Sequence, residues 1–277
     1  MNLVVQGEDV DNLALKSLAK ASGARAIERI NDCAFRLIEA TASAQTDALA
    51  RAARLDVARV EAGRRLADFG LFVTDMDSTL INIECIDEVA DMQGLKAEVA
   101  EITEAAMRGE IDFTQSLTRR VSLLAGLPER ALEEVFETRL QLNPGAERLL
   151  AHLQQAGIHT VLVSGGFTYF TERLKQRLGF DEAWANALEV RDGRLTGRVV
   201  GDIVDGAAKA AHLVRIRDRL GLAPEQVMAA GDGANDRPMF EAAGYTVAYR
   251  AKPVLREIAD CPLDFVGLDG VLNLFEG

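Results

Sequence analysis

Cysteine and histidine are scarce in this chain, which holds only three residues of each type. The cysteines, Cys33, Cys85 and Cys261, are widely separated, and no CxxC pair or cluster of Cys and His occurs. A disulfide framework usually shows an even number of regularly spaced cysteines, and a structural zinc site needs such a cluster. The sequence therefore indicates neither a disulfide framework nor a zinc site.

Positive charge is also in deficit, since 31 lysines and arginines oppose 43 aspartates and glutamates and give a formal net charge of −12. A non-specific nucleic-acid binder needs the opposite excess, because its lysines and arginines must replace the counterions of the phosphate backbone. We therefore expect no nucleic-acid partner. An anionic substrate would need a metal ion or a few well-placed cations.

Long apolar runs are lacking as well. No segment approaches the roughly 18 consecutive apolar residues of a membrane span. The first residues, MNLVVQGEDVDNLA, have neither the basic start nor the apolar stretch of a secretory signal. We expect a cytoplasmic protein with no membrane partner.

What the chain does contain, from residue 70 onward, is a series of short apolar runs that alternate with helical patterns. The runs are GLFVTD, HTVLVSG, QVMAAGD and YTVAY. Fully apolar strands that alternate with helices are typical of a parallel sheet covered on both faces. The sequence predicts an α/β fold with a Rossmann-like parallel sheet, in which functional groups gather beyond the carboxyl ends of the strands.

Two other regions differ in pattern. Residues 85–142 carry helical periodicity without a comparable apolar strand, which predicts a helical cap inserted after the first core strand. Residues 1–69 combine the strand-like NLVVQ and DVARV with the amphipathic DVDNLALKSLAKAS, which favours a small α+β module. We therefore expect two domains, 1–69 and 70–277.

The stretch VTDMDSTLINIECIDEVA carries the clearest chemical signal. Asp75 and Asp77 directly follow the apolar run, and Glu84 comes shortly after them. Carboxylates crowded at the end of a buried strand repel one another, so a cation must share the site or one of them must hold a proton. The pattern is not an EF-hand loop, because its sixth position is Leu80 rather than Gly.

Three later segments add to this site. VSGGF places Ser164 between an apolar run and two glycines, where backbone N–H groups can bind an anion. GDGAND offers Asp232, Asn235 and Asp236 as the hard oxygen ligands that Mg²⁺ prefers. Lys209 lies between these segments, in GAAKAAH. Taken singly, each segment also suits a tight turn, a polar loop or the surface of a helix.

Taken together and in this order, the four segments resemble the haloacid dehalogenase-like phosphatase superfamily over residues 70–277. The cap stretch ITEAAMRGEIDFTQSLTRRVSLLAGL, the WANAL segment and the AKP at 251–253 are similar to the members of that family that act on phosphoserine. The resemblance implies an Mg²⁺-dependent phosphatase that hydrolyses O-phospho-L-serine to serine and phosphate through an aspartyl-phosphate. This reaction would be the last step of serine biosynthesis.

The same resemblance assigns roles at the rim of the sheet. Asp75 would be the nucleophile, and Asp77 would protonate the leaving oxygen and then deprotonate the attacking water. Mg²⁺ would be bound by Asp75, by the backbone carbonyl of Asp77 and by Asp232. Asp236 would orient these ligands or Lys209.

The substrate would be held from two sides. Four groups would bind the phosphoryl oxygens: Ser164, the Gly165 amide, Lys209 and Asn235. Phosphoserine also carries an ammonium and a carboxylate, which the family binds through an acid and an arginine, here Glu84 and Arg120. Arg119 stands beside Arg120, and only the alignment of RRVSLL selects the second. Met107 and Phe113 would wall the site.

Two alternatives remain open from the sequence. A phosphotransferase would pass the phosphoryl group from Asp75 to another alcohol, such as homoserine. A catalytically silent regulator would keep the fold and bind an amino acid without turning over phosphoserine. The module at residues 1–69 is expected either to resemble an amino-acid-sensing ACT domain or to form a homodimer.

Overall fold

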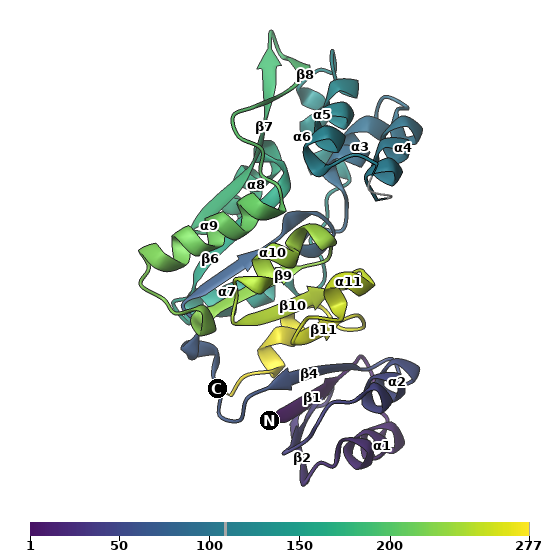
Figure 1. Ribbon diagram of the computed structural model, residues 1–277, viewed down its shortest axis with the longest axis vertical. Coiled ribbons are helices and arrows are strands. Elements are labelled where there is room, and N and C mark those ends of the chain that lie inside the picture. Colours follow the sequence, from purple (N-terminus) through teal and green to yellow (C-terminus); the bar gives the residue numbers. More distant parts are fainter. Residues whose placement is uncertain (108–109, 277) are drawn as a thin grey trace.

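The computed structural model describes residues 1–107 and 110–276, with the side chain of Met107 outside the described part. Its main body is a seven-stranded sheet in the order β11-β10-β9-β5-β6-β7-β8 (Figure 1). The strands are β5 (Leu71–Thr74), β6 (His159–Phe167), β7 (Glu182–Arg191), β8 (Arg194–Val200), β9 (Val227–Gly231), β10 (Tyr245–Tyr249) and β11 (Cys261–Leu263). Neighbouring strands pair in parallel except for β7 and β8, which are antiparallel. The predicted α/β fold with a parallel sheet is confirmed.

Helices cover both faces of this sheet. They are α7 (Ala146–Gln155), α8 (Thr168–Leu178), α9 (Gly206–Arg219), α10 (Arg237–Glu241) and α11 (Pro253–Arg256). In β5, Leu71 and Val73 share a core with α9 and α10, whereas Phe72 shares the opposite core with α7 and α8. Successive strand residues point to opposite faces, so a strand covered on both sides must be apolar throughout. This explains the uninterrupted run of apolar residues in β5.

The helical cap expected after the first core strand is confirmed. It contains α3 (Cys85–Asp91), α4 (Lys96–Met107), α5 (Phe113–Leu123) and α6 (Arg130–Thr138), which lie between β5 and α7 in the chain. A capping box begins α5, because Asp112 accepts a hydrogen bond from the Gln115 backbone and the Gln115 side chain accepts one from the Asp112 backbone. None of the described helices is long and apolar enough to cross a membrane.

The hairpin of β7 and β8 extends from the sheet to the cap (Figure 1). The sequence analysis did not predict it. Its turn has φ of 50° at Asp192 and 70° at Gly193, the positive values that two-residue hairpin turns need. The backbone of Leu195 in β8 donates to the Leu127 carbonyl and accepts from Gly126, both at 2.8 Å. The hairpin therefore fastens the cap to the core through main-chain hydrogen bonds.

The N-terminal residues form a second, antiparallel sheet in the order β2-β3-β1-β4. Its elements are β1 (Asn2–Gln6), α1 (Asn12–Ser22), β2 (Ala26–Asn31), β3 (Ala34–Ile38), α2 (Ala44–Ala52) and β4 (Asp56–Val60). Asp11 caps α1 by accepting from two backbone N–H groups, and Ser43 begins α2 with a capping box. The β-α-β-β-α-β order is that of a ferredoxin-like module.

A buried carboxylate joins this sheet to the main body. Asp56, at the start of β4, is 2% exposed. Its Oδ1 accepts from the backbone of Asp264 at 2.8 Å, and its Oδ2 accepts from Phe265 at 3.0 Å and Val266 at 3.1 Å. Burial raises the pKa of Asp56 to about 6, although the three N–H groups oppose this shift. The docking of the two sheets therefore includes a titratable group.

Candidate active site

Three predicted site residues meet at one rim of the main sheet. Thr74, the last residue of β5, is in register with Leu162 of β6 and Ala230 of β9. Asp75 follows Thr74 by one residue, while Ser164 and Asp232 follow Leu162 and Ala230 by two. Since the strands are parallel, all three side chains lie beyond the same carboxyl ends, as the sequence predicts. One detail differs: β6 continues past Ser164, because Phe167 still pairs with β7.

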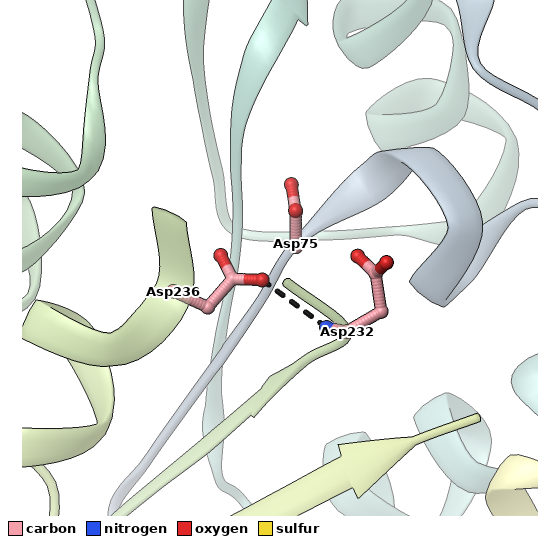
Figure 2. Close-up of side chains that lie close together, drawn as sticks. All are labelled: Asp75, Asp232 and Asp236. Atoms are coloured by element: carbon pink, nitrogen blue, oxygen red, sulfur yellow. Dashed lines mark hydrogen bonds between the residues drawn. The ribbon is translucent and has the colours of Figure 1, made fainter. Parts of the chain in front are cut away.

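A cluster of carboxylates occupies the centre of this rim. Asp75, Asp232 and Asp236 offer oxygen atoms that all lie within 4.8 Å of one another (Figure 2). Asp236 is fully buried, and its Oδ2 accepts from the backbone N–H groups of Asp232 at 3.1 Å and Gly233 at 3.2 Å. These bonds fix the loop that carries Asp232, so Asp236 holds Asp232 in position within the cluster.

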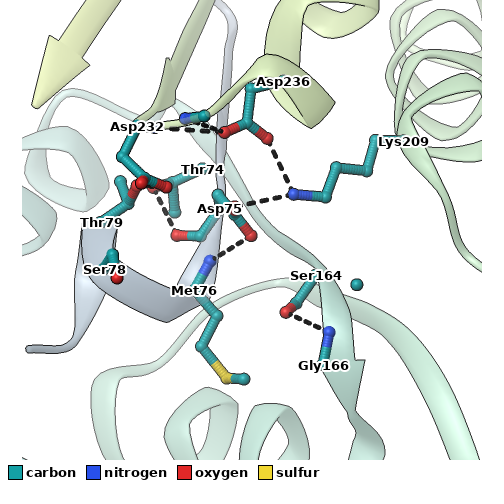
Figure 3. A network of polar contacts seen from close by, with 12 residues as sticks. Thr74, Asp75, Met76, Ser78, Thr79, Ser164, Gly166, Lys209, Asp232 and Asp236 are labelled. Atoms are coloured by element: carbon teal, nitrogen blue, oxygen red, sulfur yellow. Dashed lines mark hydrogen bonds and ion pairs between the residues drawn. The ribbon is translucent and has the colours of Figure 1, made fainter. Parts of the chain in front are cut away.

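Lys209 is the cation closest to this cluster in the described part of the chain. Its side chain is 1% exposed, and its Nζ lies 2.8 Å from Oδ2 of Asp75 and 2.8 Å from Oδ1 of Asp236 (Figure 3). Asp205 caps the start of α9, the helix that presents Lys209. Burial opposes the charge on the ammonium, but Asp236 and Asp75 outweigh it and raise the pKa of Lys209. Lys209 therefore stays charged.

The negative charge at the rim exceeds what one ammonium can balance. Burial and the neighbouring Asp236 raise the pKa of Asp75 well above its ordinary value, in spite of Lys209. Burial and Asp236 likewise raise the pKa of Asp232 to about 7. Such shifts arise where burial and neighbouring carboxylates outweigh the available counter-charge. Carboxylate oxygens are the hard ligands that Mg²⁺ prefers, so a divalent cation fits this donor set.

Asp77 lies in the irregular turn that follows β5 (Met76–Leu80), in which Ser78 has a φ of 56°. Its Oδ1 accepts from the backbone N–H of Cys85 at 3.1 Å. Burial, followed by repulsion from Glu84, raises the pKa of Asp77 to about 7. A carboxyl group with such a pKa can both donate and accept a proton near neutral pH.

The glycines of VSGGF let this turn approach β6 closely. A Cβ on Gly166 would lie 2.7 Å from Oδ2 of Asp77 and 2.9 Å from Cε of Met76. The Gly166 N–H donates to Oγ of the buried Ser164 at 2.8 Å. A Cβ on Gly165 would lie 3.0 Å from Cζ of Phe113, so the cap residue Phe113 packs over this loop.

Asn186 is a site residue that our sequence reasoning missed. It is fully buried in β7, and its Nδ2 donates to the carbonyl of Gly165 at 2.8 Å. Its Oδ1 accepts from the backbone of Val204 at 2.8 Å. The side chain thus ties the VSGGF loop to the segment that leads into α9. The WANAL segment contains Asn186 and could have drawn attention to it, but the segment alone does not reveal that Asn186 bonds to Gly165 and Val204.

The remaining predicted residue of the GDGAND motif is Asn235, which is half-buried. It lies in the turn Ala234–Asp236. A Cβ on Gly206, the first residue of α9, would lie 2.6 Å from the backbone oxygen of Asn235. The Asn235 loop therefore packs against the start of the helix that carries Lys209.

On the cap side, the structure places an acid and an arginine above the rim. Glu84 accepts from Oγ of Ser78 at 2.7 Å. Arg120 is half-buried and interacts electrostatically with Asp87, Glu84 and Asp77, whereas Arg119 is exposed. Burial lowers the pKa of Arg120. Of the two adjacent arginines, Arg120 is therefore the one that faces the acidic groups of the site.

Asp87 is a second residue that the sequence analysis did not single out. Its Oδ1 and the Nε of Arg120 are both buried without a hydrogen-bond partner among the described residues. Burial raises the pKa of Asp87, and Arg120 is the largest opposing influence. The site thus contains polar atoms available to a ligand. Met107, expected to wall this region, has its side chain outside the described residues.

The comparisons with known proteins agree with this geometry. The family model for haloacid dehalogenase-like hydrolases matches residues 72–241, more than half of the chain. The chain belongs to the haloacid dehalogenase-like hydrolase family. The matched residues, 72–241, include the rim, the cap and the GDGAND loop. A second model, for a domain of unknown function (DUF4072), matches residues 3–65.

Named relatives of this hydrolase are phosphoserine phosphatases. The phosphoserine phosphatase of Albidiferax ferrireducens is 52% identical over 217 residues, which cover 76% of this chain and 92% of that protein. The crystal structure of a probable phosphoserine phosphatase from Vibrio cholerae has a TM-score of 0.86 and 38% identity, over 99% of this chain and 86% of that one. A phospho-aspartyl intermediate analogue of phosphoserine phosphatase has a TM-score of 0.70 and 41% identity, over 75% of this chain and 99% of that one.

Proposed function

We propose that this hydrolase is an Mg²⁺-dependent phosphatase that converts O-phospho-L-serine to L-serine and phosphate. The observation that carries the proposal is the arrangement of Asp75. It lies at the rim within reach of Lys209, beside Asp232 and Asp236 and below a cap that presents Glu84 and Arg120. This reaction would be the last step of serine biosynthesis, which would place the protein in the cytoplasm.

The metal would be held by the carboxylates of Asp75 and Asp232 and by the backbone carbonyl of Asp77. When bound, Mg²⁺ would neutralise the cluster and polarise the phosphoryl group. Asp236 serves a different purpose in this proposal, because its two oxygens already bind Lys209 and the backbone of the Asp232 loop. It would keep Asp232 and Lys209 in position.

Asp75 would attack phosphorus with a carboxylate oxygen. Oδ1 of Asp75 accepts a hydrogen bond from the Met76 N–H at 2.7 Å, while Oδ2 faces Lys209. The bond from phosphorus to the serine oxygen breaks as the aspartyl-phosphate forms, and Asp77 gives its proton to that oxygen. Asp77 then takes a proton from water, which attacks phosphorus and releases Asp75. A single carboxyl group can serve both steps because its pKa is about 7.

The phosphoryl oxygens would be bound by groups on two loops and one helix. Ser164 and the Gly165 N–H come from the β6 loop, Lys209 comes from α9, and Asn235 comes from the GDGAND loop. Lys209 remains charged throughout, so it can stabilise the negative charge that develops on the transferring group. Asn186 would support this arrangement by fixing the Gly165 carbonyl.

The cap would select the serine part of the substrate. Glu84 would bind the ammonium, Arg120 would bind the carboxylate in a forked pair, and Phe113 and Met107 would wall the site. The Arg120 Nε atom, buried without a partner among the described residues, supports this assignment. A carboxylate there would satisfy it and would offset the burial of the guanidinium.

We further propose that residues 1–69 form a separate module and residues 70–277 the phosphatase, with the cap at about 85–142. The β-α-β-β-α-β order of the module suits an ACT-like fold or a dimerising unit. Sedimentation of the full chain would test whether it is a homodimer.

Phosphate release from phosphoserine, measured with and without Mg²⁺, tests the proposed activity. We expect turnover only with the metal, and faster hydrolysis of phosphoserine than of phosphothreonine or phosphoglycolate. Adding homoserine tests the phosphotransferase alternative, which predicts O-phosphohomoserine at the expense of free phosphate. Binding of serine without any hydrolysis of phosphoserine would instead favour the silent regulator.

A further inference from the structure

A cleft that shares no residue with the candidate active site lies between the N-terminal module and the main body. Its walls come from α2 and β4 on one side and from α11 and β11 on the other, and its volume is about 150 Å³. Small and apolar side chains line its floor, among them Ala50, Leu55, Val57 and Ala259. Both bodies of the chain therefore contribute to it.

Charged groups of both signs line the cleft, and some of them are already paired. Arg256 contacts Oδ2 of Asp264 at 2.7 Å. Asp260 accepts from the backbone and the hydroxyl of Thr246, at 3.0 and 2.8 Å. Each of these two side chains therefore already has a partner within the protein.

Three other charged groups in the lining have no such partner. Asp47 of α2, Arg59 of β4 and Glu257 after α11 form no ion pair or side-chain hydrogen bond with another residue described here. Arg59 contributes only its backbone, which donates to Asp260 at 3.0 Å and accepts from the Tyr245 hydroxyl at 2.9 Å. The cleft thus presents one unpaired cation and two unpaired anions above an apolar floor.

We propose that this cleft binds a small free α-amino acid. Arg59 would bind the α-carboxylate, Asp47 or Glu257 would bind the α-ammonium, and the apolar floor would contact a short side chain. A cavity of this size accommodates a molecule of about six non-hydrogen atoms, as with benzene in an engineered cavity. L-Alanine has that size and carries both charges.

The position of the cleft connects it to the catalytic rim. Lys252, which precedes α11, donates its N–H to the carbonyl of Asp232 at 2.8 Å. Arg256 and Glu257, at the other end of this short helix, line the cleft. A bound amino acid would therefore contact the helix that also holds the Asp232 loop.

Isothermal titration of the full-length protein with L-alanine tests the proposal. The titrations use the Arg120→Ala background, since the proposed function gives the active site its own affinity for amino acids through Arg120. Phosphatase activity is measured separately, so failure of either proposal is recognisable by itself. Propionate corresponds to L-alanine without the ammonium, and ethylamine corresponds to L-alanine without the carboxylate. We expect L-alanine to bind at least tenfold more tightly than either.

Two further variants in that background locate the ligand. Arg59→Gln and the double substitution Asp47→Asn with Glu257→Gln should each weaken L-alanine binding at least tenfold. Arg51→Gln, at an exposed position of α2 outside the cleft, should leave it unchanged. Unchanged melting temperatures would establish that the variants fold. Absence of L-alanine binding, equal binding of propionate or ethylamine, or binding that survives in both variants would overturn the proposal.

Discussion

The ammonium of Lys209 lies 2.8 Å from Oδ2 of Asp75, with both side chains buried under the rim of the sheet. Removing it should leave Asp75 and Asp236 without their common counter-charge. We expect Lys209→Met to lower kcat by about 10²- to 10³-fold, the usual effect of losing one preorganised electrostatic group. It should also destabilise the metal-free protein by roughly 3–5 kcal/mol, because a buried charge loses its partner.

Steady-state kinetics and urea unfolding measure these two effects. Lys16→Met is the matched control, since Lys16 is exposed on α1. Near-normal kcat in Lys209→Met would show that the ammonium acts neither on the nucleophile nor on the phosphoryl group.

Arg119 and Arg120 offer a paired test of substrate selection. Arg120→Ala should raise the KM for phosphoserine by roughly 10- to 100-fold, since hydrogen bonds to charged groups contribute about 1.5–3 kcal/mol each. It should change the hydrolysis of p-nitrophenyl phosphate, which has neither an ammonium nor a carboxylate, much less. Arg119→Ala, at the exposed neighbouring position, should leave both substrates unaffected. Equal losses on both substrates in Arg120→Ala would mean that Arg120 has a structural role.

Asn186 should position the VSGGF loop without touching the substrate. Asn186→Leu keeps the side-chain size but removes the bonds to Gly165 and Val204, leaving buried polar groups unsatisfied at a cost of about 1–3 kcal/mol each. We expect the inhibition constant of inorganic phosphate to rise together with the KM for phosphoserine. Asn12→Leu, at an exposed position of α1, is the control. A lower melting temperature with unchanged phosphate inhibition would contradict the positioning role.

Asp56 should make stability depend on pH. Burial raises the pKa of Asp56 from an ordinary value of 3.8 to about 6 in the folded protein. A carboxyl group whose pKa is raised by folding stabilises the protein fully below pH 3.8, and this contribution disappears as the pH rises through about 6. The difference corresponds to ~3 kcal/mol.

The free energy of unfolding, measured by urea at pH 4 and pH 7, tests this for the native chain and for Asp56→Asn. Between the two pH values, the free energy of unfolding should fall by about 2 kcal/mol less in Asp56→Asn than in the native chain. Asp9→Asn, at an exposed position, should show the full fall of the native chain. Equal pH dependence in Asp56→Asn and the native chain would refute the assignment.

The rim could be predicted from sequence because each of its residues is recognised from the short segment around it. Asp75, Ser164 and Asp232 each follow an apolar run, and parallel strands bring such positions together whatever the length of chain between them. The choice between Arg119 and Arg120 required a family resemblance, because both lie on one helix and only the packing of α5 against the site turns one of them inward. The cap likewise followed from helical periodicity alone.

Asn186 and Asp87 escaped prediction for the opposite reason. The partners of Asn186, Gly165 and Val204, are distant in sequence and are joined only by the folded hairpin, and Asp87 is recognised only by the arginine that it faces. The hairpin itself could have been predicted, since Asp192 and Gly193 form a common two-residue turn sequence. Most residues of its strands are half-buried, and polar residues interrupt the apolar ones, so these strands lack the continuous apolar runs of the core strands.

The central claim concerns Asp75 as the residue that receives the phosphoryl group. The most direct measurement is to quench the protein with acid during turnover of phosphoserine, reduce the acyl phosphate with borohydride and map the peptides by mass spectrometry. The account predicts homoserine at position 75 in the native chain and unmodified asparagine there in Asp75→Asn. Steady turnover with no modification at position 75, or with modification only at Asp77, would contradict it.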